Sequence, residues 1–294
     1  MDVTTFLPRL QRQLAAHAAD NTATQRPTST ASVAAIFRWK EQHKTTLQVL
    51  FIRRSINPRD AWSGQIAFPG GRRQRRANGT EWESSVETAQ RETLEEIGLD
   101  LTEAHVQWLG SLPPSQTHLR AFWVGTEVFF IDASAEERAF TPVKQESEVA
   151  DVFWVDVHEL FNQKRYQRLL WPLQDVVRAL RQRPRVTQVL ESVLGQLSFG
   201  AIYLPRPTHA APDDDMTQRT AHDFVLWGLT LGMLAKLFDI AEMPLPMKEL
   251  GPQFESKRLG NVFLSLSRRP DVFLKRTLAV VVVCGAAITL YNRV

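Results

Sequence analysis

Three glutamates in one short segment constrain this chain more than any other feature. Glu92, Glu95 and Glu96 lie at offsets of zero, three and four residues, so a helix that carries them presents all three carboxylates on one face. Like charges at this spacing repel one another by a few tenths of a kcal/mol (~0.2–0.5) per pair. The cluster therefore predicts a cation among the carboxylates. Hard divalent cations such as Mg²⁺ and Mn²⁺ take oxygen ligands and keep several waters, which leaves room for a substrate phosphate.

The residues around the acids are typical of a helix that ends at Gly98, a common C-terminal stop. Four side chains are predicted on the face away from the acids: Val86, Thr93, Leu94 and Ile97. The alternative interpretation is a surface helix stabilised by salt bridges, because the composition of residues 91–96 suits any exposed helix.

The order of residues extends well beyond the acids. The pair Gly70-Gly71 precedes Glu83, and after seven residues follows Arg91-Glu92-Thr93-Leu94-Glu95-Glu96-Ile97-Gly98-Leu99. This order resembles the signature of the Nudix hydrolases, Gly-x5-Glu-x7-Arg-Glu-U-x-Glu-Glu-x-Gly-U, where U is aliphatic. The resemblance implies an α+β fold, the Nudix-type α/β/α sandwich with a mixed sheet. It also implies a metal site for Mg²⁺ or Mn²⁺ formed by Glu92, Glu95, Glu96 and the carbonyl of Gly71.

Two positions depart from the signature. Ala77 stands where the strict pattern has glycine, and Thr93 stands at an aliphatic position. We interpret the first departure as an insertion between Gly71 and Glu83, because a longer loop costs little free energy. The insertion contains Arg72, Arg73, Arg75 and Arg76. These arginines either contact an anionic substrate or belong to a mobile solvated loop.

A narrower resemblance lies upstream. Arg54-Ser55 and the segment Gly64–Gly71, GQIAFPGG, resemble the extended motif of the coenzyme A diphosphatases, RS…G-x-V-x-FPGG-x-x-D. The resemblance implies that Arg54, Ser55, Gly70 and Gly71 bind substrate. The closing aspartate of the motif is replaced by Gln74. Residues 199–205 and 226–232 also resemble the C-terminal part of this subgroup, although a buried strand and an apolar core helix explain them equally well.

The resemblance also assigns catalytic roles, to Glu95, Glu96, Arg91 and Glu148. Cleavage of a phosphoanhydride requires neutralised charge on the phosphoryl oxygens and a water directed at phosphorus, which metals held by the glutamates supply. Arg91 is expected to orient a glutamate through charge-assisted hydrogen bonds. The general base comes from the helix or from Glu148, since residues 148–155 resemble the segment after the family's catalytic loop. The alternative for Glu148 is a solvated acid.

Composition bounds the class of protein. The chain has 294 residues, of which 44% are apolar and 23% charged, as in ordinary globular proteins. Its net charge is only +3 and no basic motif with interleaved aromatic residues is present, so we predict no nucleic-acid partner. The single cysteine, Cys284, excludes an internal disulfide and suits a reducing, intracellular compartment.

Short runs rich in β-branched and aromatic residues predict strands at 32–39, 46–53, 64–68, 106–109, 122–131 and 152–155, with a loop at Pro113-Pro114 and a helix over 224–240. These elements indicate a mixed sheet covered by helices. We expect a Nudix domain over residues 31–182, a C-terminal helical extension over 183–250 that packs on it, and a connector over 251–271.

The two ends of the chain leave alternatives open. Residues 1–30 form a predicted peripheral segment and linker, in which Phe6, Leu10 and Leu14 have helical spacing. This segment is either a docking helix or a targeting presequence. Residues 272–291 are a candidate membrane anchor, with a buried helix as the rival. The uncharged stretch of fifteen residues, 277–291, reaches about 22 Å, less than a hydrocarbon core of roughly 30 Å. Basic residues before it would keep the catalytic domain on the cytosolic side.

We therefore predict a metal-dependent hydrolase of a small-molecule nucleotide substrate. Coenzyme A or an acyl derivative is the expected substrate, yielding 3′,5′-ADP and 4′-phosphopantetheine. One alternative is a hydrolase of ADP-ribose or dinucleotides, and another is a membrane-tethered module that binds a nucleotide without turnover. The complete set of three acids argues against the last, because a pure binding module does not need metals that activate water.

Overall fold

The computed structural model describes residues 5–20, 29–40, 45–57, 60, 62–76, 79, 81–116, 123–132, 142–173, 184–208, 219–220, 222–247 and 249–256. The chain divides into two compact units. The first comprises Met1–Gln116, Phe122–Gln167 and Ala201–Lys248, and the second comprises Thr117–Ala121, Arg168–Gly200 and Glu249–Val294. All residues of the candidate site lie in the first unit.

A seven-stranded mixed sheet forms the middle of the first unit. Its main path runs in the order β3 (Ile66–Ala67), β2 (Leu47–Arg54), β1 (Ala31–Trp39), β6 (Trp123–Ile131) and β5 (Val106–Gln116). In addition, β4 (Gly70–Arg72) pairs with β1, and β7 (Val149–Asp156) pairs with β2. The β1 and β6 strands are parallel and the other pairs are antiparallel, so the predicted mixed sheet is confirmed.

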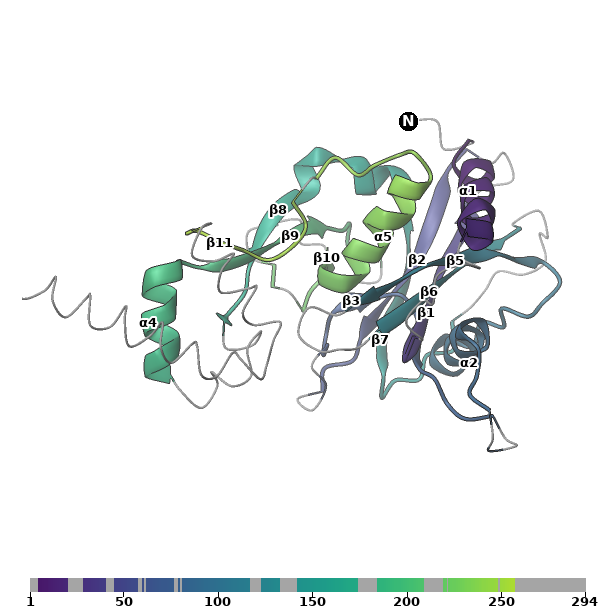
Figure 1. Ribbon diagram of the computed structural model, residues 1–294, viewed down its shortest axis with the longest axis horizontal. Helices are drawn as coiled ribbons and strands as arrows, with labels where there is room; N and C mark the ends of the chain where they lie inside the picture. Colours follow the sequence, from purple (N-terminus) through teal and green to yellow (C-terminus); the bar gives the residue numbers. More distant parts are fainter. Residues whose placement is uncertain are drawn as a thin grey trace, which may run out of the picture. The chain divides into compact units, whose positions relative to one another are not determined.

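Helices cover both faces of this sheet (Figure 1). On one face lies α2 (Ser85–Ile97), whose Ile97 shares a buried cluster with Ile36 of β1. Neighbouring residues of a strand point to opposite faces, and the ring of Phe37 lies 5.5 Å from that of Phe6 in α1 (Phe6–Asp20). Phe6 in turn lies 5.0 Å from Phe238 in α5 (Gly228–Ile240). The first unit is therefore a three-layer α/β/α sandwich.

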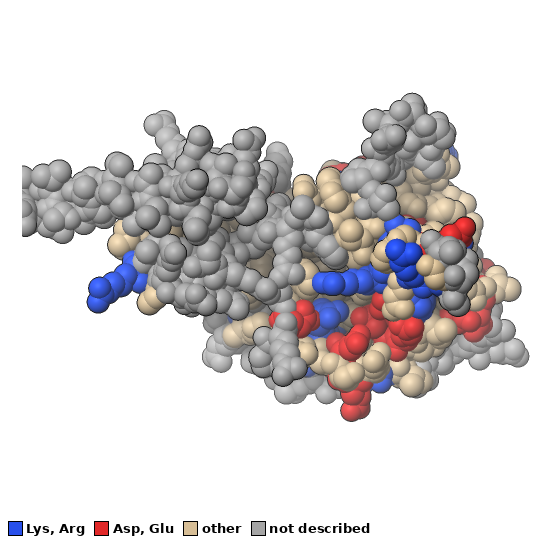
Figure 2. Space-filling view, turned by 60° about the horizontal axis from the view of Figure 1, so that its bottom comes forward, with Lys and Arg blue, Asp and Glu red and all other residues tan. Residues whose placement is uncertain are grey.

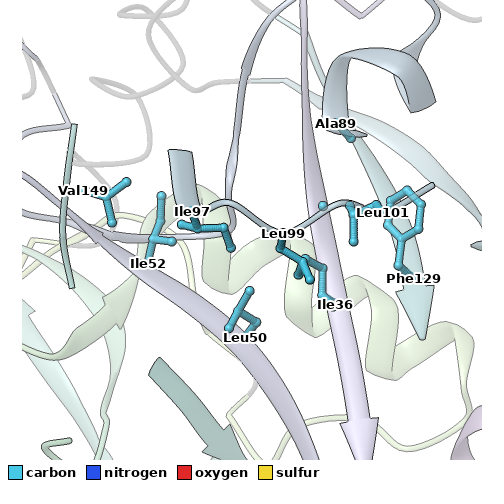
Figure 3. Packing of buried hydrophobic residues seen from close by; sticks show 10 residues of the cluster. Ile36, Leu50, Ile52, Ala89, Ile97, Leu99, Leu101, Phe129 and Val149 are labelled. Atoms are coloured by element: carbon cyan, nitrogen blue, oxygen red, sulfur yellow. The ribbon is translucent and has the colours of Figure 1, made fainter. Parts of the chain in front are cut away.

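The buried cluster between α2 and the sheet supports the candidate site (Figure 3). Side chains of β1, β2, β6 and β7 meet there with those of α2 and of the turn after it. The members are Ala34, Ile36, Leu50, Ile52, Ala89, Ile97, Leu99, Leu101, Phe129 and Val149. Because close-packed interiors resist displacement, this cluster holds the inner face of α2 at a defined distance from the sheet.

Two expectations about element boundaries were wrong. The predicted loop at Pro113-Pro114 lies inside β5, where the pairing register shifts between Leu112 and Ser115. Because β5 lies at the end of the sheet's path and is irregular there, the prolines sacrifice few ladder hydrogen bonds. The helix expected from residue 224 begins at Gly228, because residues 225–227 form the strand β10.

The N-terminal helix α1 docks on the first unit through its apolar side. Phe6, Leu10 and Leu14 are each at most 1% exposed. Gly110 of β5 leaves room for this helix, because a Cβ atom there would lie 3.0 Å from Cβ of Leu14. The spacing of the three apolar residues in the sequence thus corresponds to a packed face of α1.

The second unit contains α4 (Pro184–Leu194) and β11 (Gln253–Phe254). The strand β9 (Leu197–Tyr203) belongs to both units: its first half pairs with β11, and its second half pairs with β10 (Val225–Trp227) of the first unit. The remaining elements are β8 (Tyr166–Leu170), which pairs with β9, and the 3₁₀ turns η3 (Val157–Phe161) and η4 (Gln163–Arg165).

Within the described part of the chain, every helix is too short or too polar to cross a bilayer. The candidate anchor at residues 272–291 and the connector beyond residue 256 lie outside the described residues. The anchor therefore stays a prediction.

Truncation of Phe6 tests the docking of α1. We expect Phe6→Ala to lower the free energy of unfolding by roughly 3–5 kcal/mol, because it removes an aromatic ring packed between two others. Urea denaturation followed by circular dichroism gives this value. The exposed Arg9→Ala on the same helix is the control and should change it by less than about 0.5 kcal/mol. Equal midpoints for both variants would contradict the packing of α1.

Candidate active site

The helix that carries the acids is fixed at both ends by its own sequence. Ser84 caps the N-terminus: the Glu87 N–H donates to Ser84 Oγ at 3.1 Å, and the Ser84 N–H donates to Glu87 Oε2 at 2.6 Å. This reciprocal pair is a capping box, which satisfies two otherwise unpaired amides. At the other end Gly98 adopts φ of 73°, and its N–H donates to the Leu94 carbonyl. The predicted stop at Gly98 is confirmed.

The inner face of α2 differs from the prediction in one position. Thr93 and Ile97 are buried as expected and Val86 is half-buried, but Leu94 is 48% exposed. In its place Glu96 faces inward and is only 1% exposed. Residues 94 and 96 lie on nearly opposite sides of a helix, so a helix that buries Glu96 together with Thr93 and Ile97 turns Leu94 outward.

The turn Gly70-Gly71 lies directly against two of the three predicted metal-binding carboxylates. The Gly70 N–H donates to Glu96 Oε2 at 2.8 Å. A Cβ atom at Gly71 would lie 2.5 Å from Glu92 Oε2, and one at Gly70, where φ is 149°, would lie 2.3 Å from the Ser32 carbonyl. Only glycine allows this approach, so the two glycines explain how the loop reaches the carboxylates.

The two carboxylates against this turn are poorly solvated and repel each other. Burial raises the pKa of Glu96 to about 8; the Gly70 N–H and Arg54 counteract this rise, and the charges of Glu92 and Glu148 add to it. Burial also raises the pKa of Glu92, and the charges of Glu95 and Glu148 raise it further against the opposing effect of Arg91. The charge of Glu148 therefore acts on both Glu92 and Glu96, which shows that the three acids lie near one another.

Arg91 contacts three of the four glutamates of the signature: Glu83, Glu92 and Glu95. Its Nε and Nη2 atoms donate to the two oxygens of Glu83 at 2.6 and 3.1 Å, and Nη1 donates to Glu95 Oε2 at 2.8 Å. Nη2 also lies 2.9 Å from Glu92 Oε1 and donates to the Arg72 carbonyl at 3.0 Å. Arg91 thereby ties α2 to β4. Its hydrogen bond is the main reason that the pKa of Glu83 is lowered.

The described residues on the two sides of the arginine-rich insertion pair with each other, an arrangement that we call the hairpin. Arg75 and Trp82 pair as an antiparallel bridge, and the Arg76 N–H donates to the Glu81 carbonyl at 2.8 Å. The guanidinium of Arg75 lies 5.1 Å from the Trp82 ring centre, and that of Arg76 pairs with Glu81 and with Glu87 of α2.

Arg73 fastens the base of this hairpin. It donates through Nε to the Glu83 carbonyl at 2.7 Å and through Nη1 to the Ser29 carbonyl at 3.2 Å. Three of the four inserted arginines thus have protein partners, and Arg72 is exposed. Figure 2 shows acidic and basic side chains lying side by side on this part of the surface.

Three further predicted residues come from distant parts of the sequence. Arg54 Nη1 lies 3.7 Å from Glu96 Oε1. The Ser55 N–H donates to the Glu148 carbonyl at 2.8 Å, and the Gln145 N–H donates to the Glu96 carbonyl at 2.9 Å. The end of β2, the segment before β7 and the last turn of α2 are therefore hydrogen-bonded together. Predicted substrate-binding residues Arg54 and Ser55 thus lie beside predicted acids Glu96 and Glu148.

One residue of this group had no signal in the sequence. Asp60 Oδ2 accepts from Arg54 Nε and lies 2.9 Å from Arg54 Nη2. Asp60 lies six positions after Arg54 and beyond the end of β2, so strand periodicity does not predict the pair.

The donor chemistry of the site fits a hard divalent cation. Among the described residues, no three His, Cys, Asp or Glu side chains converge closely enough to form a complete metal site. The carboxylates of Glu92 and Glu96 nevertheless supply desolvated oxygens that repel one another, and Gly71 lies against Glu92. Oxygen ligands of this kind suit Mg²⁺ and Mn²⁺. Glu95 lies further out, with its side chain 50% exposed and paired with Arg91.

Comparison with known proteins decides the family. A family model described as NUDIX domain matches residues 28–174, which is half of the chain. The chain belongs to the Nudix family. This membership agrees with the enzyme class predicted from the sequence, a phosphoanhydride hydrolase.

Similar proteins were found by sequence and by structure. An uncharacterised protein of Schizosaccharomyces pombe (strain 972) is 30% identical to this Nudix protein over 195 residues, which are 60% of this chain and 56% of the relative. The chain thus spans about half the length of the curated relative it matches. A MutT/nudix family protein from Enterococcus faecalis is 20% identical, with 51% of this chain and 54% of that chain covered and a TM-score of 0.32. The NUDIX domain of Shewanella oneidensis NrtR, solved with ADP ribose, is 20% identical, with 50% and 84% covered and a TM-score of 0.32.

A methyl group at Gly71 tests the arrangement of loop and helix. We expect Gly71→Ala to weaken Mn²⁺ binding by about tenfold or more, because the new Cβ collides with the Glu92 carboxylate. Titration of Mn²⁺, followed by electron paramagnetic resonance of the free ion, measures this affinity. Gly232→Ala in α5 is the matched control, because a Cβ there meets nothing within 4 Å. Unchanged affinity in Gly71→Ala would contradict the prediction that the carboxylate packed against Gly71 binds the metal.

Proposed function

We propose that this protein is a divalent-metal-dependent hydrolase that cleaves the phosphoanhydride of a nucleoside diphosphate linked to another moiety. The observation that carries the proposal is the pair of desolvated carboxylates, Glu92 and Glu96, held against the backbone of Gly70-Gly71. Membership of the Nudix family supports it. A structural helix gains nothing from burying two acids that repel each other, whereas a cation site requires them.

The residues proposed to hold Mg²⁺ or Mn²⁺ are Glu92, Glu95, Glu96 and the carbonyl of Gly71. When bound, the cation supplies neutralisation of the phosphoryl charge and lowers the pKa of a bound water. Arg91 is a positioning residue in this proposal: it orients Glu92 and Glu95 through the contacts at 2.9 and 2.8 Å, and Glu83 fixes Arg91 in turn.

Two side chains outside α2 complete the proposed site. In this proposal Arg54 donates to an oxygen of the diphosphate. Its Nη1 atom lies 3.7 Å from Glu96 Oε1, beyond hydrogen-bonding distance, so this atom is available to a phosphoryl oxygen beside Glu96. Glu148 is the general base in this proposal, because its backbone is hydrogen-bonded to the residue that follows Arg54 at the end of β2, beside Glu96. Ser55 holds the backbone of Glu148 in place through its N–H.

Coenzyme A or an acyl-coenzyme A is the proposed substrate, with 3′,5′-ADP and 4′-phosphopantetheine as products. The support is the run of motif residues Arg54, Ser55, Gly70 and Gly71, all of which lie next to the glutamate cluster. ADP-ribose or a dinucleotide is the second candidate, because Gln74 replaces the closing aspartate of the coenzyme A motif. The backbone N–H of Gln74 donates to Glu83 Oε2 at 3.0 Å, a contact that does not depend on the side chain at this position.

A substrate panel combined with Glu96→Gln tests the proposal. Coenzyme A, acetyl-coenzyme A, ADP-ribose and diadenosine tetraphosphate are incubated with Mg²⁺ or Mn²⁺, and products are separated by chromatography. We expect coenzyme A compounds to be cleaved fastest. Glu96→Gln should reduce kcat by at least about 10²-fold, because a bound metal contributes several kcal/mol and each 1.36 kcal/mol is a factor of ten.

Glu191→Gln, at an exposed position of α4, is the control and should retain wild-type turnover. Full activity of Glu96→Gln would refute the proposed site. Binding of these nucleotides without any turnover by the wild-type protein would instead identify a binding module.

A further inference from the structure

The strand β2 ends with two consecutive arginines, Arg53 and Arg54. Each of them pairs with an aspartate, but the two guanidinium groups have different surroundings. Arg53 donates to Asp151 Oδ2 at 2.6 Å and lies 5.1 Å from the Phe224 ring centre. Arg54 donates to Asp60 Oδ2 at 2.9 Å and also approaches Glu96. Of the two guanidinium groups, that of Arg54 approaches a glutamate of α2, whereas that of Arg53 pairs with Asp151.

The guanidinium of Arg54 is divided between two carboxylates. Its Nε and Nη2 atoms both lie 2.9 Å from Asp60 Oδ2, whereas Nη1 remains 3.7 Å from Glu96 Oε1. A charge-assisted N–H···O hydrogen bond measures about 2.7–2.9 Å, so Asp60 holds Arg54 just short of bonding to Glu96.

Asp60 also has hydrogen-bond partners in the backbone of Asn57 and Trp62. Its Oδ1 accepts from the Trp62 N–H at 3.0 Å, and its own N–H donates to the Asn57 carbonyl at 2.9 Å. Further along the chain, the Ser63 carbonyl lies 2.9 Å from His222 Nδ1. Both oxygens of the Asp60 carboxylate therefore accept hydrogen bonds.

We propose that Asp60 is a positioning residue that keeps Arg54 beside Glu96 without letting it occupy the Glu96 carboxylate. This inference rests on the proposed function, in which Glu96 is a metal ligand. Without the Asp60 charge, Arg54 closes the remaining distance to Glu96 and competes with the cation for the same oxygens. With Asp60 in place, Nη1 stays available for a phosphoryl oxygen of the substrate.

Mn²⁺ affinity of the full-length protein tests this role without any need for turnover. We expect Asp60→Asn to bind Mn²⁺ about tenfold more weakly than the wild type, while asparagine keeps an oxygen for the Trp62 N–H. Asp151→Asn is the matched control, because it removes the equivalent partner of Arg53, and it should stay within about twofold of the wild type.

A double variant separates action through Arg54 from a direct effect of the Asp60 charge. Arg54→Met combined with Asp60→Asn should bind Mn²⁺ as tightly as Arg54→Met alone, because the competing guanidinium is absent. A further tenfold loss in the double variant would overturn the inference, as would wild-type affinity in Asp60→Asn. If Asp60→Asn does not fold, Arg54→Lys replaces it, since a lysine lacks the fork that Asp60 grips and should weaken Mn²⁺ binding similarly.

The outcome is separable from that of the proposed function. A wild-type protein that binds Mn²⁺ but cleaves no member of the substrate panel contradicts the hydrolase, and the variant series still decides the role of Asp60. A wild-type protein that does not bind Mn²⁺ contradicts both.

Discussion

The burial of Glu96 beside Glu92 is the constraint on which the rest of the first unit depends. A carboxylate that is 1% exposed loses most of its hydration and is tolerated only where donors or cations replace the lost water. The Gly70 N–H supplies one donor at 2.8 Å, and Arg91 and Arg54 bring positive charge to either side of the pair. These groups do not remove the repulsion between the two acids, which leaves a site suited to a divalent cation.

The surrounding structure holds this unfavourable cluster in place. The buried side chains under α2 fix the helix against the sheet, and the capping box and Gly98 fix its two ends. The base of the insertion adds a second support, because Arg73 and Gln74 bind Glu83, and Glu83 in turn binds Arg91. The insertion that lengthens the signature loop therefore reinforces the orientation of the glutamates.

The sequence predicts those parts of the site that depend on local spacing. The helix, its end at Gly98 and the grouping of acids follow from offsets of a few residues, and the glycine pair follows from the need for close backbone approach. Contacts between distant segments were beyond such reasoning. Leu94 was wrongly placed inward, because periodicity defines faces of a helix and not what covers them. Asp60 and the ordered hairpin were missed, because their partners are set by tertiary packing.

The position of the cation tests the account most directly. Crystals grown with Mn²⁺ and measured near the manganese absorption edge should show an anomalous difference peak within coordination distance of the Glu92 and Glu96 carboxylates and the Gly71 carbonyl, at about 2.0–2.3 Å. A manganese peak elsewhere on the protein would contradict the claim that these buried acids hold a metal. In that case Glu92 would keep Arg91 as its partner, and Glu96 would keep the Gly70 N–H.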